Sequence, residues 1–368
     1  MYLKKFEVKN FKNFKREFTF DLSDVRDYTF NRDCVTNDVI KTGIIYGKNS
    51  IGKTNFGLAI FDITYHLVDK MRMQDSNNLY TNADSRFKQA KFNYHFDIDG
   101  KNVEYKYGKT NYFTLTTEEL IIDGESLFSY DFEKNVGQLD KLKSIPELAD
   151  LTLAFREKTM SIVRFIANNS NLDNSHPIKK IVDFVGRMLW FRNVDNLNKF
   201  MGFAANTEFI FDYVCNNDYI DDLNKFLKDN GVNEVLEYKT TPDKRKVIYF
   251  KHKTLLPFSV ASSGTKALIT FYYWYKHFSQ ASFVFIDEFD AFYHFELAEK
   301  VVKLATAADI QVFFTSHNTN LLSNRIMRPD CYFILTKDKL TSFANATKRE
   351  LREGHNLEKL FISGEFGE

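Results

Sequence analysis

One short stretch of glycine, lysine and threonine carries the clearest chemical signal in this sequence. It runs Gly47, Lys48, Asn49, Ser50, Ile51, Gly52, Lys53 and Thr54, and fits the phosphate-binding pattern G-x-x-x-x-G-K-[ST]. A strand-like run at 41–46 precedes it and a helical pattern follows, which argues against a chance glycine turn. Backbone N–H groups and a helix dipole attract an anion to such a loop. We therefore predict a nucleoside triphosphate site in which Lys53 binds phosphate and Thr54 binds Mg²⁺.

Three polar residues follow two later apolar runs, and their types are those used in phosphoryl transfer. Asp287 and Glu288 end the run at 282–286, and His317 follows the run at 311–315. Because ligands of parallel sheets gather at the carboxyl ends of strands, we expect these side chains near the phosphate loop. Asp287 would be a second Mg²⁺ ligand, Glu288 would activate the attacking water, and His317 would hydrogen-bond the γ-phosphate. The structural alternatives are an Asp–Glu pair at a helix N-terminus and a non-catalytic histidine.

A second anion site is expected at the start of another helix. Ser262, Ser263, Gly264 and Thr265 precede a helical pattern at 267–277, and a helix N-terminus attracts negative charge. One nucleotide does not need two such sites in one chain. The pattern makes sense if two copies of the chain sandwich ATP, so that this segment of one copy meets the γ-phosphate held by the other. An ordinary Ser/Thr N-cap is the alternative.

The elements that position these residues fall into three parts. Residues 1–144 alternate like strands around the phosphate loop, and Asp99-Gly100 predicts a hairpin turn, so an antiparallel sheet is expected there. Residues 145–235 predict a helical insertion, with helices at 161–166, 178–190, 194–201 and 219–227. Residues 236–368 return to alternating strands and helices, which is typical of a mainly parallel α/β core.

Composition limits the classes of protein. The 368 residues include 50 Lys and Arg against 49 Asp and Glu, and this net charge of +1 gives no general support for a nucleic-acid or membrane partner. Cys34, Cys215 and Cys331 lack metal-ligand spacing and fit a reducing, cytoplasmic compartment. No apolar run reaches the roughly 18 residues of a membrane span, and the N-terminus does not resemble a signal peptide.

Taken together, these motifs resemble those of an ABC/SMC-type ATPase head. Residues 10–14 resemble the turn near the nucleotide, 47–54 the Walker A motif and 262–266 the ABC signature. Residues 283–288 resemble the Walker B motif, 290–294 the D-loop, and His317 the switch histidine. The strings S-S-G-T-K, I-D-E-F-D-A-F-Y-H and F-F-T-S-H-N-T-N-L-L are similar to those of stand-alone, OLD-like ATPases of bacterial anti-phage and abortive-infection systems. The resemblance implies an ABC-type P-loop NTPase head: α/β with a mixed parallel core, an N-terminal antiparallel subdomain and a helical insertion, using ATP and Mg²⁺.

Several features depart from that family pattern. The signature lacks L-S-G-G-Q, and Ser50 stands where Walker A usually has an internal glycine. No glutamine can be placed as the Q-loop residue; Gln74, Gln89 and Gln138 are the candidates. Little chain follows the ATPase tail, so we expect no fused TOPRIM nuclease and assign any effector activity to a separate partner.

The favoured hypothesis is a homodimeric ATPase that closes around ATP and controls a nuclease or toxin in anti-phage defence. The alternative is a RecF-type recombination ATPase, in which basic clusters at Lys9, Lys12, Lys15, Arg16 and 244–246 would bind DNA. A third hypothesis is a nucleotide-sensing scaffold with negligible hydrolysis. ATP turnover, its loss in Glu288→Gln and salt-dependent DNA binding distinguish the three.

Overall fold

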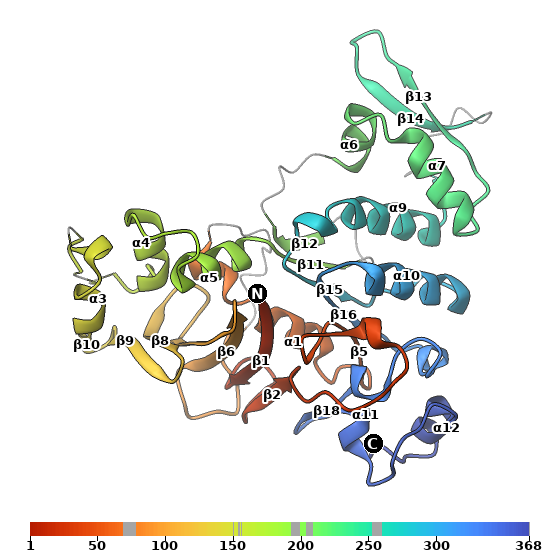
Figure 1. The fold of residues 1–368 in the computed structure, drawn as a ribbon. Coiled ribbons are helices and arrows are strands. Elements are labelled where there is room, and N and C mark those ends of the chain that lie inside the picture. Colours follow the sequence, from red (N-terminus) through yellow and green to blue (C-terminus); the bar gives the residue numbers. More distant parts are fainter. Residues whose placement is uncertain are drawn as a thin grey trace.

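Two sheets and the helices between and around them make up the fold in the computed structural model. It describes residues 1–68, 79–149, 151–153, 155, 157–192, 199–203, 209–251 and 260–367. One sheet has strand order β12-β11-β15-β16-β5-β17-β18, and the other has order β10-β9-β8-β7-β6-β1-β2. Figure 1 shows the second sheet beside the first, with the N-terminus near its strand β1.

The first sheet is the α/β core. Its inner strands β11, β15, β16, β5 and β17 run parallel, while β12 and β18 are antiparallel edge strands. Every residue of β5, β15 and β16 is buried, as expected for strands covered on both faces. Its strands are β5 (Thr42–Tyr46), β11 (Met188–Arg192), β12 (Lys199–Gly202), β15 (Phe283–Asp287), β16 (Gln311–Thr315), β17 (Tyr332–Leu335) and β18 (Leu340–Ser342).

The second sheet is antiparallel and confirms the prediction for the N-terminal part. At the predicted hairpin turn, Asp99 and Gly100 have φ of 53° and 84°, the left-handed pair that a tight two-residue turn requires. Its strands are β1 (Tyr2–Lys9), β2 (Phe18–Asp21), β6 (Ala90–Ile98), β7 (Lys101–Lys109), β8 (Leu115–Ile122), β9 (Glu125–Asp131) and β10 (Val136–Gln138). Short pairs β3 (Val35–Thr36) with β4 (Val39–Ile40), and β13 (Leu236–Thr240) with β14 (Lys246–Phe250), lie outside both sheets.

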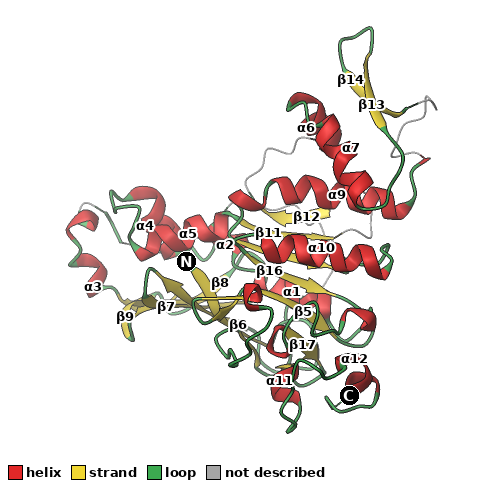
Figure 2. Cartoon of the chain, turned by 45° about the vertical axis from the view of Figure 1, so that its right-hand side comes forward, coloured by secondary structure: helices red, strands yellow, loops and turns green. Residues whose placement is uncertain are grey.

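The helices gather in separate places around the sheets. Figures 1 and 2 both show α3 to α5 beside the antiparallel sheet, and α6, α7 and the β13–β14 hairpin above α9. The α-helices are α1 (Lys53–Ile60), α2 (Thr64–Leu67), α3 (Asp140–Lys143), α4 (Ile162–Asn169), α5 (Pro177–Gly186), α6 (Ile210–Asn216), α7 (Ile220–Asp229), α9 (Ser263–Lys276), α10 (Phe295–Ala307), α11 (Phe343–Ala346) and α12 (Leu357–Ile362). Short 3-10 turns are η1 (Arg32–Cys34), η2 (Pro146–Leu148), η3 (Phe278–Gln280), η4 (Thr319–Leu321) and η5 (Pro329–Cys331).

Helix α1 is wedged between the two sheets. Its Phe56 ring packs against Phe20 of β2, with centroids 5.3 Å apart. On its other side, a Cβ at Gly57 would lie 2.6 Å from the Phe285 ring of β15, so only glycine allows this approach. The opposite face of the core sheet is covered by α9, whose Trp274 stacks on Phe191 of β11 at 5.8 Å. The helix that starts at the phosphate loop therefore has a fixed position.

The prediction of an entirely helical segment at 145–235 is wrong for 188–192 and 199–202. These residues form β11 and β12 of the core sheet, whereas the predicted helices at 178–190 and 194–201 include 188–190 and 199–201. The apolar run Met-Leu-Trp-Phe has no period that separates a buried strand from a helix. Residues 193–198 lie outside the described part of the chain. The boundaries at 144/145 and 235/236 stay a prediction.

The fold class predicted from the sequence is confirmed. A P-loop strand lies in a mixed, largely parallel sheet, and an antiparallel sheet packs against its helix. Within the described residues, no helix combines the length and the apolar character that crossing a membrane requires.

Candidate nucleotide-binding and hydrolysis site

The predicted phosphate loop joins β5 to α1. Gly52 caps the helix with φ of 113°, and Lys53 is the first helical residue. The Lys53 Nζ folds back over the loop and donates to the carbonyl oxygens of Gly47 at 2.8 Å and Lys48 at 3.3 Å. A Cβ at Gly47 would lie 2.8 Å from the Leu335 carbonyl oxygen, so no side chain fits there. The loop, the lysine and the helix N-terminus therefore lie close together, as phosphate binding requires.

The turn near residue 13 supports this loop from outside. Asn13 Nδ2 donates to the Ile51 carbonyl at 2.9 Å, and its Oδ1 accepts from Asn55 Nδ2 at 2.8 Å. A Cβ at Gly52 would lie 2.3 Å from Asn13 Nδ2. The turn therefore braces both the loop and the first turn of α1. The resemblance placed 10–14 near the nucleotide, but no local pattern identified Asn13 as the contacting residue.

Asp287 lies at the centre of the site and receives two hydroxyl hydrogen bonds. Thr54 Oγ1 donates to Oδ2 and Thr315 Oγ1 donates to Oδ1, each at 2.8 Å. Thr315 Oγ1 also accepts the backbone N–H of Glu288 at 2.7 Å. The predicted metal ligands Thr54 and Asp287 thus converge, and Thr315 is an additional residue that sequence reasoning missed.

Glu288 has a left-handed backbone and a guanidinium partner. Its φ is 47°, in the left-handed region that a non-glycine residue seldom adopts. Residues held in this conformation cluster at functional sites. Its Oε2 accepts from Arg192 Nη2 at 2.7 Å, and Arg192 Nε lies 3.8 Å from Asp287 Oδ2. Arg192 was not predicted, because it lies within the predicted helical insertion at 145–235, between two expected helices, where no strand end was expected.

Burial shifts the pKa values of two acids and one base in the site. Burial raises the pKa of Asp287, which is fully buried, although the hydrogen bond from Thr315 opposes this shift. Burial also raises the pKa of Asp290, whose Oδ2 accepts from Ser316 Oγ at 2.6 Å. Burial lowers the pKa of Lys53, against the attraction of the nearby carboxylates. A cation that shared the site would favour the ionised carboxylates.

His317 lies beside the phosphate-loop lysine. Its Nδ1 is 3.5 Å from Lys53 Nζ, and its pKa is lowered by burial and by the Lys53 charge. An ammonium group can only donate, so Nδ1 is assigned as the acceptor and Nε2 carries the hydrogen of the neutral ring. The ring can therefore donate a hydrogen bond from Nε2, as the predicted γ-phosphate contact requires.

The donor set fits Mg²⁺. Thr54 and Asp287 offer a hydroxyl and a carboxylate oxygen 2.8 Å apart, and Mg²⁺ binds oxygen ligands, often one or two from protein and the rest from phosphate and water. The neighbouring lysine and the exposed N–H groups of the loop would hold the phosphates. The residues present therefore suit a magnesium–nucleotide complex.

Ser262 to Thr265 lie at the start of α9. Ser262 Oγ accepts from the Thr265 N–H at 3.1 Å, so it is an N-cap, which was the structural alternative. Ser263 is exposed, and a Cβ at Gly264 would lie 3.0 Å from the Phe292 carbonyl in the region predicted as the D-loop. A role toward a second copy of the chain stays a prediction.

The glutamine candidates do not identify a Q-loop residue. Gln89 accepts from Thr116 Oγ1 at 2.8 Å next to the antiparallel sheet, and Gln138 is exposed in its edge strand β10. Gln74 lies outside the described residues.

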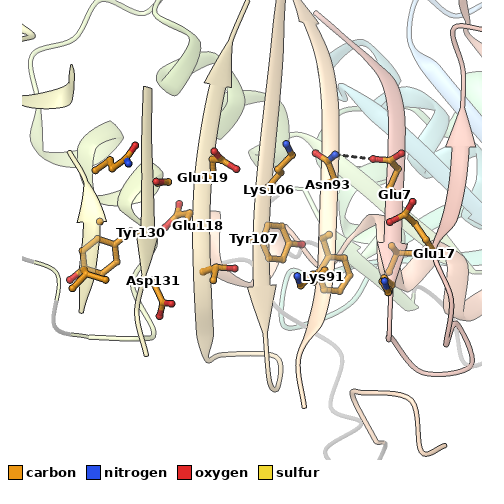
Figure 3. Close-up of a pocket in the computed structure, with 18 residues that line it drawn as sticks. Glu7, Glu17, Lys91, Asn93, Lys106, Tyr107, Glu118, Glu119, Tyr130 and Asp131 are labelled. Atoms are coloured by element: carbon orange, nitrogen blue, oxygen red, sulfur yellow. Dashed lines mark hydrogen bonds between the residues drawn. The ribbon is translucent and has the colours of Figure 1, made fainter. Parts of the chain in front are cut away.

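A groove of 770 Å³ lies on the exposed face of the antiparallel sheet, away from the motifs (Figure 3). Its lining alternates acidic and basic side chains, with Glu7, Glu119 and Asp131 among Lys91 and Lys106. None of its lining residues belongs to 47–54 or 287–288. The groove's mixed charge gives it no preference for an anion, so the nucleotide site is assigned from the motif residues instead.

One comparison with known proteins shows the family of this chain. A family model described as "AAA domain, putative AbiEii toxin, Type IV TA system" matches residues 44–323. Among curated proteins, none matches the sequence significantly.

Solved structures with similar folds include heads of SMC proteins and RecF. The SMC head domain from Thermotoga maritima aligns over 93% of this chain and 99% of that chain, with 14% identity and a TM-score of 0.44. The structure of the recombination mediator protein RecF with ATP aligns over 93% of this chain and 99% of that chain, with 14% identity and a TM-score of 0.41. An Smc head domain derived from Pyrococcus furiosus, bound to the C-terminal domain of ScpA, aligns over 92% of this chain and 95% of that chain. Its identity is 12% and its TM-score is 0.44. Likenesses at these values do not extend to function.

Proposed function

The chain belongs to the P-loop ATPase family described as an AAA domain, putative AbiEii toxin of a type IV TA system, and on this premise we propose that it hydrolyses ATP. We propose further that two copies close around ATP and thereby control a separate effector, a nuclease or toxin, in anti-phage defence. The observation that carries the proposal is the convergence of Thr54, Asp287 and Glu288 beside the phosphate loop.

Each polar residue of the site has one role in this proposal. Lys53 and the loop N–H groups bind the β- and γ-phosphates, and Thr54 and Asp287 hold Mg²⁺, which neutralises charge on the phosphate oxygens when bound. Glu288 orients the attacking water and accepts its proton, and the Nε2–H of His317 donates to the γ-phosphate. The buried setting of Asp287 strengthens each of these electrostatic interactions.

The exposed N-terminus of α9 supports a composite site shared between two copies. Ser262 and Ser263 are exposed there, where a phosphate held by another chain could meet the helix N-terminus. A group supplied in trans during phosphoryl transfer is worth on the order of 10³–10⁵ in rate, so dimerisation can control hydrolysis. The family description supports the toxin–antitoxin context in which such a dimer would act on a partner.

The experiment measures ATP turnover with Mg²⁺ for the wild type, Lys53→Ala and Glu288→Gln. The molar mass of each chain is measured by light scattering at saturating ATP. Glu288→Gln keeps the shape of the side chain but removes the proton acceptor. We expect it to bind ATP, lose turnover and remain a dimer, whereas Lys53→Ala stays monomeric. A wild type without turnover, or a Glu288→Gln chain that stays monomeric with ATP, would contradict the proposal.

The DNA-binding alternative stays a prediction, to be tested by duplex affinity as a function of salt. At one of the two predicted basic clusters, Arg245 pairs with Asp243 at 2.6 Å and Lys246 donates to the Cys215 carbonyl at 3.1 Å. These contacts engage two of the three cations of that cluster, and the salt dependence of duplex affinity tests whether they also bind DNA.

A further inference from the structure

We propose that Arg192 is a positioning residue for hydrolysis: it holds the Glu288 carboxylate where the attacking water must be activated. This inference rests on the proposed ATPase function and adds a residue that none of the nucleotide motifs contains. It is carried by the 2.7 Å hydrogen bond from Arg192 Nη2 to Glu288 Oε2.

The sheet itself brings Arg192 to this place. Strands β11 and β15 are parallel neighbours, and their register pairs Arg192 directly with Asp287, one residue before Glu288. Both strands end at the same edge, where the phosphate loop also begins. Trp190 and Phe191 anchor β11 in the core between α1 and α9, and each is at most 1% exposed. Arg192 therefore extends from a rigid support.

Glu288 needs such a partner because, among the described residues, its other hydrogen bonds are made by its backbone. Its N–H bonds Thr315 and its φ of 47° points the residue out of the regular strand. The side chain is 29% exposed, so water competes for its carboxylate and its rotamers are costly to order. A charge-assisted bond is roughly twice as strong as a neutral one, and this bond engages Oε2. In the proposal, Oε1 then receives the proton from water.

The shape of the guanidinium explains why an arginine stands here. Its Nη2 contacts Glu288 while its Nε lies 3.8 Å from Asp287 Oδ2, so one planar group spans both carboxylates. Two adjacent carboxylates repel each other, and the shared cation offsets that repulsion. A lysine offers a single ammonium and lacks the fixed fork. It should restore the function only in part.

The test compares Arg192→Ala and Arg192→Lys with Arg187→Ala. Arg187 immediately precedes the opposite end of the same strand, and its Nη2 pairs with Asp183 on the surface at 2.7 Å. We expect Arg192→Ala to lower kcat by about 10²-fold, the effect of losing orientation of a reacting group, with ATP affinity within about threefold of the wild type. Arg192→Lys should recover part of kcat, and Arg187→Ala should match the wild type. Melting temperatures and binding of a non-hydrolysable ATP analogue report folding.

A double substitution tests whether Arg192 acts through Glu288. If it does, adding Arg192→Ala should not lower further the slow residual hydrolysis of Glu288→Gln, followed in a single-turnover assay with the protein in excess over ATP. Unchanged or faster turnover in Arg192→Ala, a loss of ATP affinity as large as the loss of kcat, or a further loss in the double variant overturns the inference. If the wild type has no turnover, the proposed function is overturned as well. If turnover is lost in Lys53→Ala and Glu288→Gln but kept in Arg192→Ala, only the role of Arg192 is overturned.

Discussion

The Thr54 hydroxyl donates a 2.8 Å hydrogen bond to Asp287 Oδ2, a residue 233 positions further along the chain. This bond joins the first turn of α1 to the end of β15. It brings together the two oxygen ligands expected for Mg²⁺, and it holds a carboxylate whose pKa burial raises. The pair therefore links the phosphate loop to the hydrolytic residues at one point.

Thr54→Val keeps the side-chain shape but removes this hydroxyl. We expect ATP turnover to fall on the order of 10²-fold, because one contribution to transition-state charge stabilisation is lost. The gain in ATP affinity on adding Mg²⁺ should also shrink, as measured by titration with and without the cation. Thr306→Val is the matched control, since Thr306 Oγ1 donates within α10, to the Val302 carbonyl. Equal turnover in both variants would remove Thr54 from the metal site.

Thr315→Val should affect both stability and turnover. The Thr315 oxygen accepts from the Glu288 N–H and donates to Asp287, so its loss leaves a buried carboxylate and a backbone donor short of partners. We expect the free energy of unfolding to fall by about 1–3 kcal/mol, measured by urea denaturation. Thr315→Ser retains the hydroxyl and should keep turnover. If Thr315→Ser were as inactive as Thr315→Val, a methyl contact rather than the hydroxyl would be responsible.

Ser50→Gly should stabilise the phosphate loop. Ser50 has φ of 62°, and the left-handed region costs an L-residue about 1–2 kcal/mol, while glycine adopts it freely. Glycine loses more entropy on folding, so we expect a net gain of up to about 1 kcal/mol in the free energy of unfolding. Ser129→Gly, in the extended strand β9, should instead destabilise the chain. A loss of stability in both variants would contradict the strain at Ser50.

Two inactive variants should restore activity when mixed. Lys53→Ala removes the phosphate-loop cation, and Ser263→Arg places a bulky cation on the exposed start of α9. If the site is shared in a two-fold dimer, a mixed dimer has one intact site. An equal mixture should then show turnover well above that of either variant alone, because only the mixed dimer carries an intact site. Turnover no higher than that of the separate variants would argue for a site completed within one chain.

The buried His66 should make stability depend on pH. Burial, with the charges of Lys109 and Arg164, lowers its pKa well below 6.5. In the unfolded chain the imidazole takes up a proton near pH 6.5. Below that pH the unfolded state therefore binds more protons, and the free energy of unfolding falls by about 1.4 kcal/mol per pH unit until the folded histidine also protonates. Stability from this group is thus complete above pH 6.5 and is lost as the pH falls.

His66→Gln should flatten this dependence. The Tyr105 hydroxyl gives its proton to Glu118 at 2.9 Å, so His66 Nε2 is the donor to Tyr105, and a glutamine amide can replace it. Burial raises the pKa of Glu118, so this group stabilises the folded state as the pH falls, opposite to His66. The quantity to compare is therefore the difference in the free energy of unfolding between His66→Gln and the wild type at each pH. His294→Gln, at an exposed position, is the control. Parallel stability curves from pH 7.5 to 5.5 for all three chains would exclude His66 as the cause.

Local spacing was enough to predict much of the fold and the motifs. The phosphate loop, the Asp99-Gly100 hairpin and the strands ending at Asp287 and Thr315 are set by neighbours in the chain, through periodicity and turn geometry. The error at 188–202 has the same origin. The pattern of an apolar run that is buried on all sides does not distinguish a strand from a helix. Here, pairing with the neighbouring strand β15 makes residues 188–192 a strand.

The sequence by itself determined the residue types of the site and the strand ends or loops that carry them. Only the tertiary structure decided which of them touch: Thr315 with Asp287, Asn13 with the phosphate loop, and Arg192 with Glu288. These pairs depend on strand order and register, which the packing of both sheets against α1 selects as a whole. A shift of β11 by one residue would turn Arg192 to the other face of the sheet and remove it from the site.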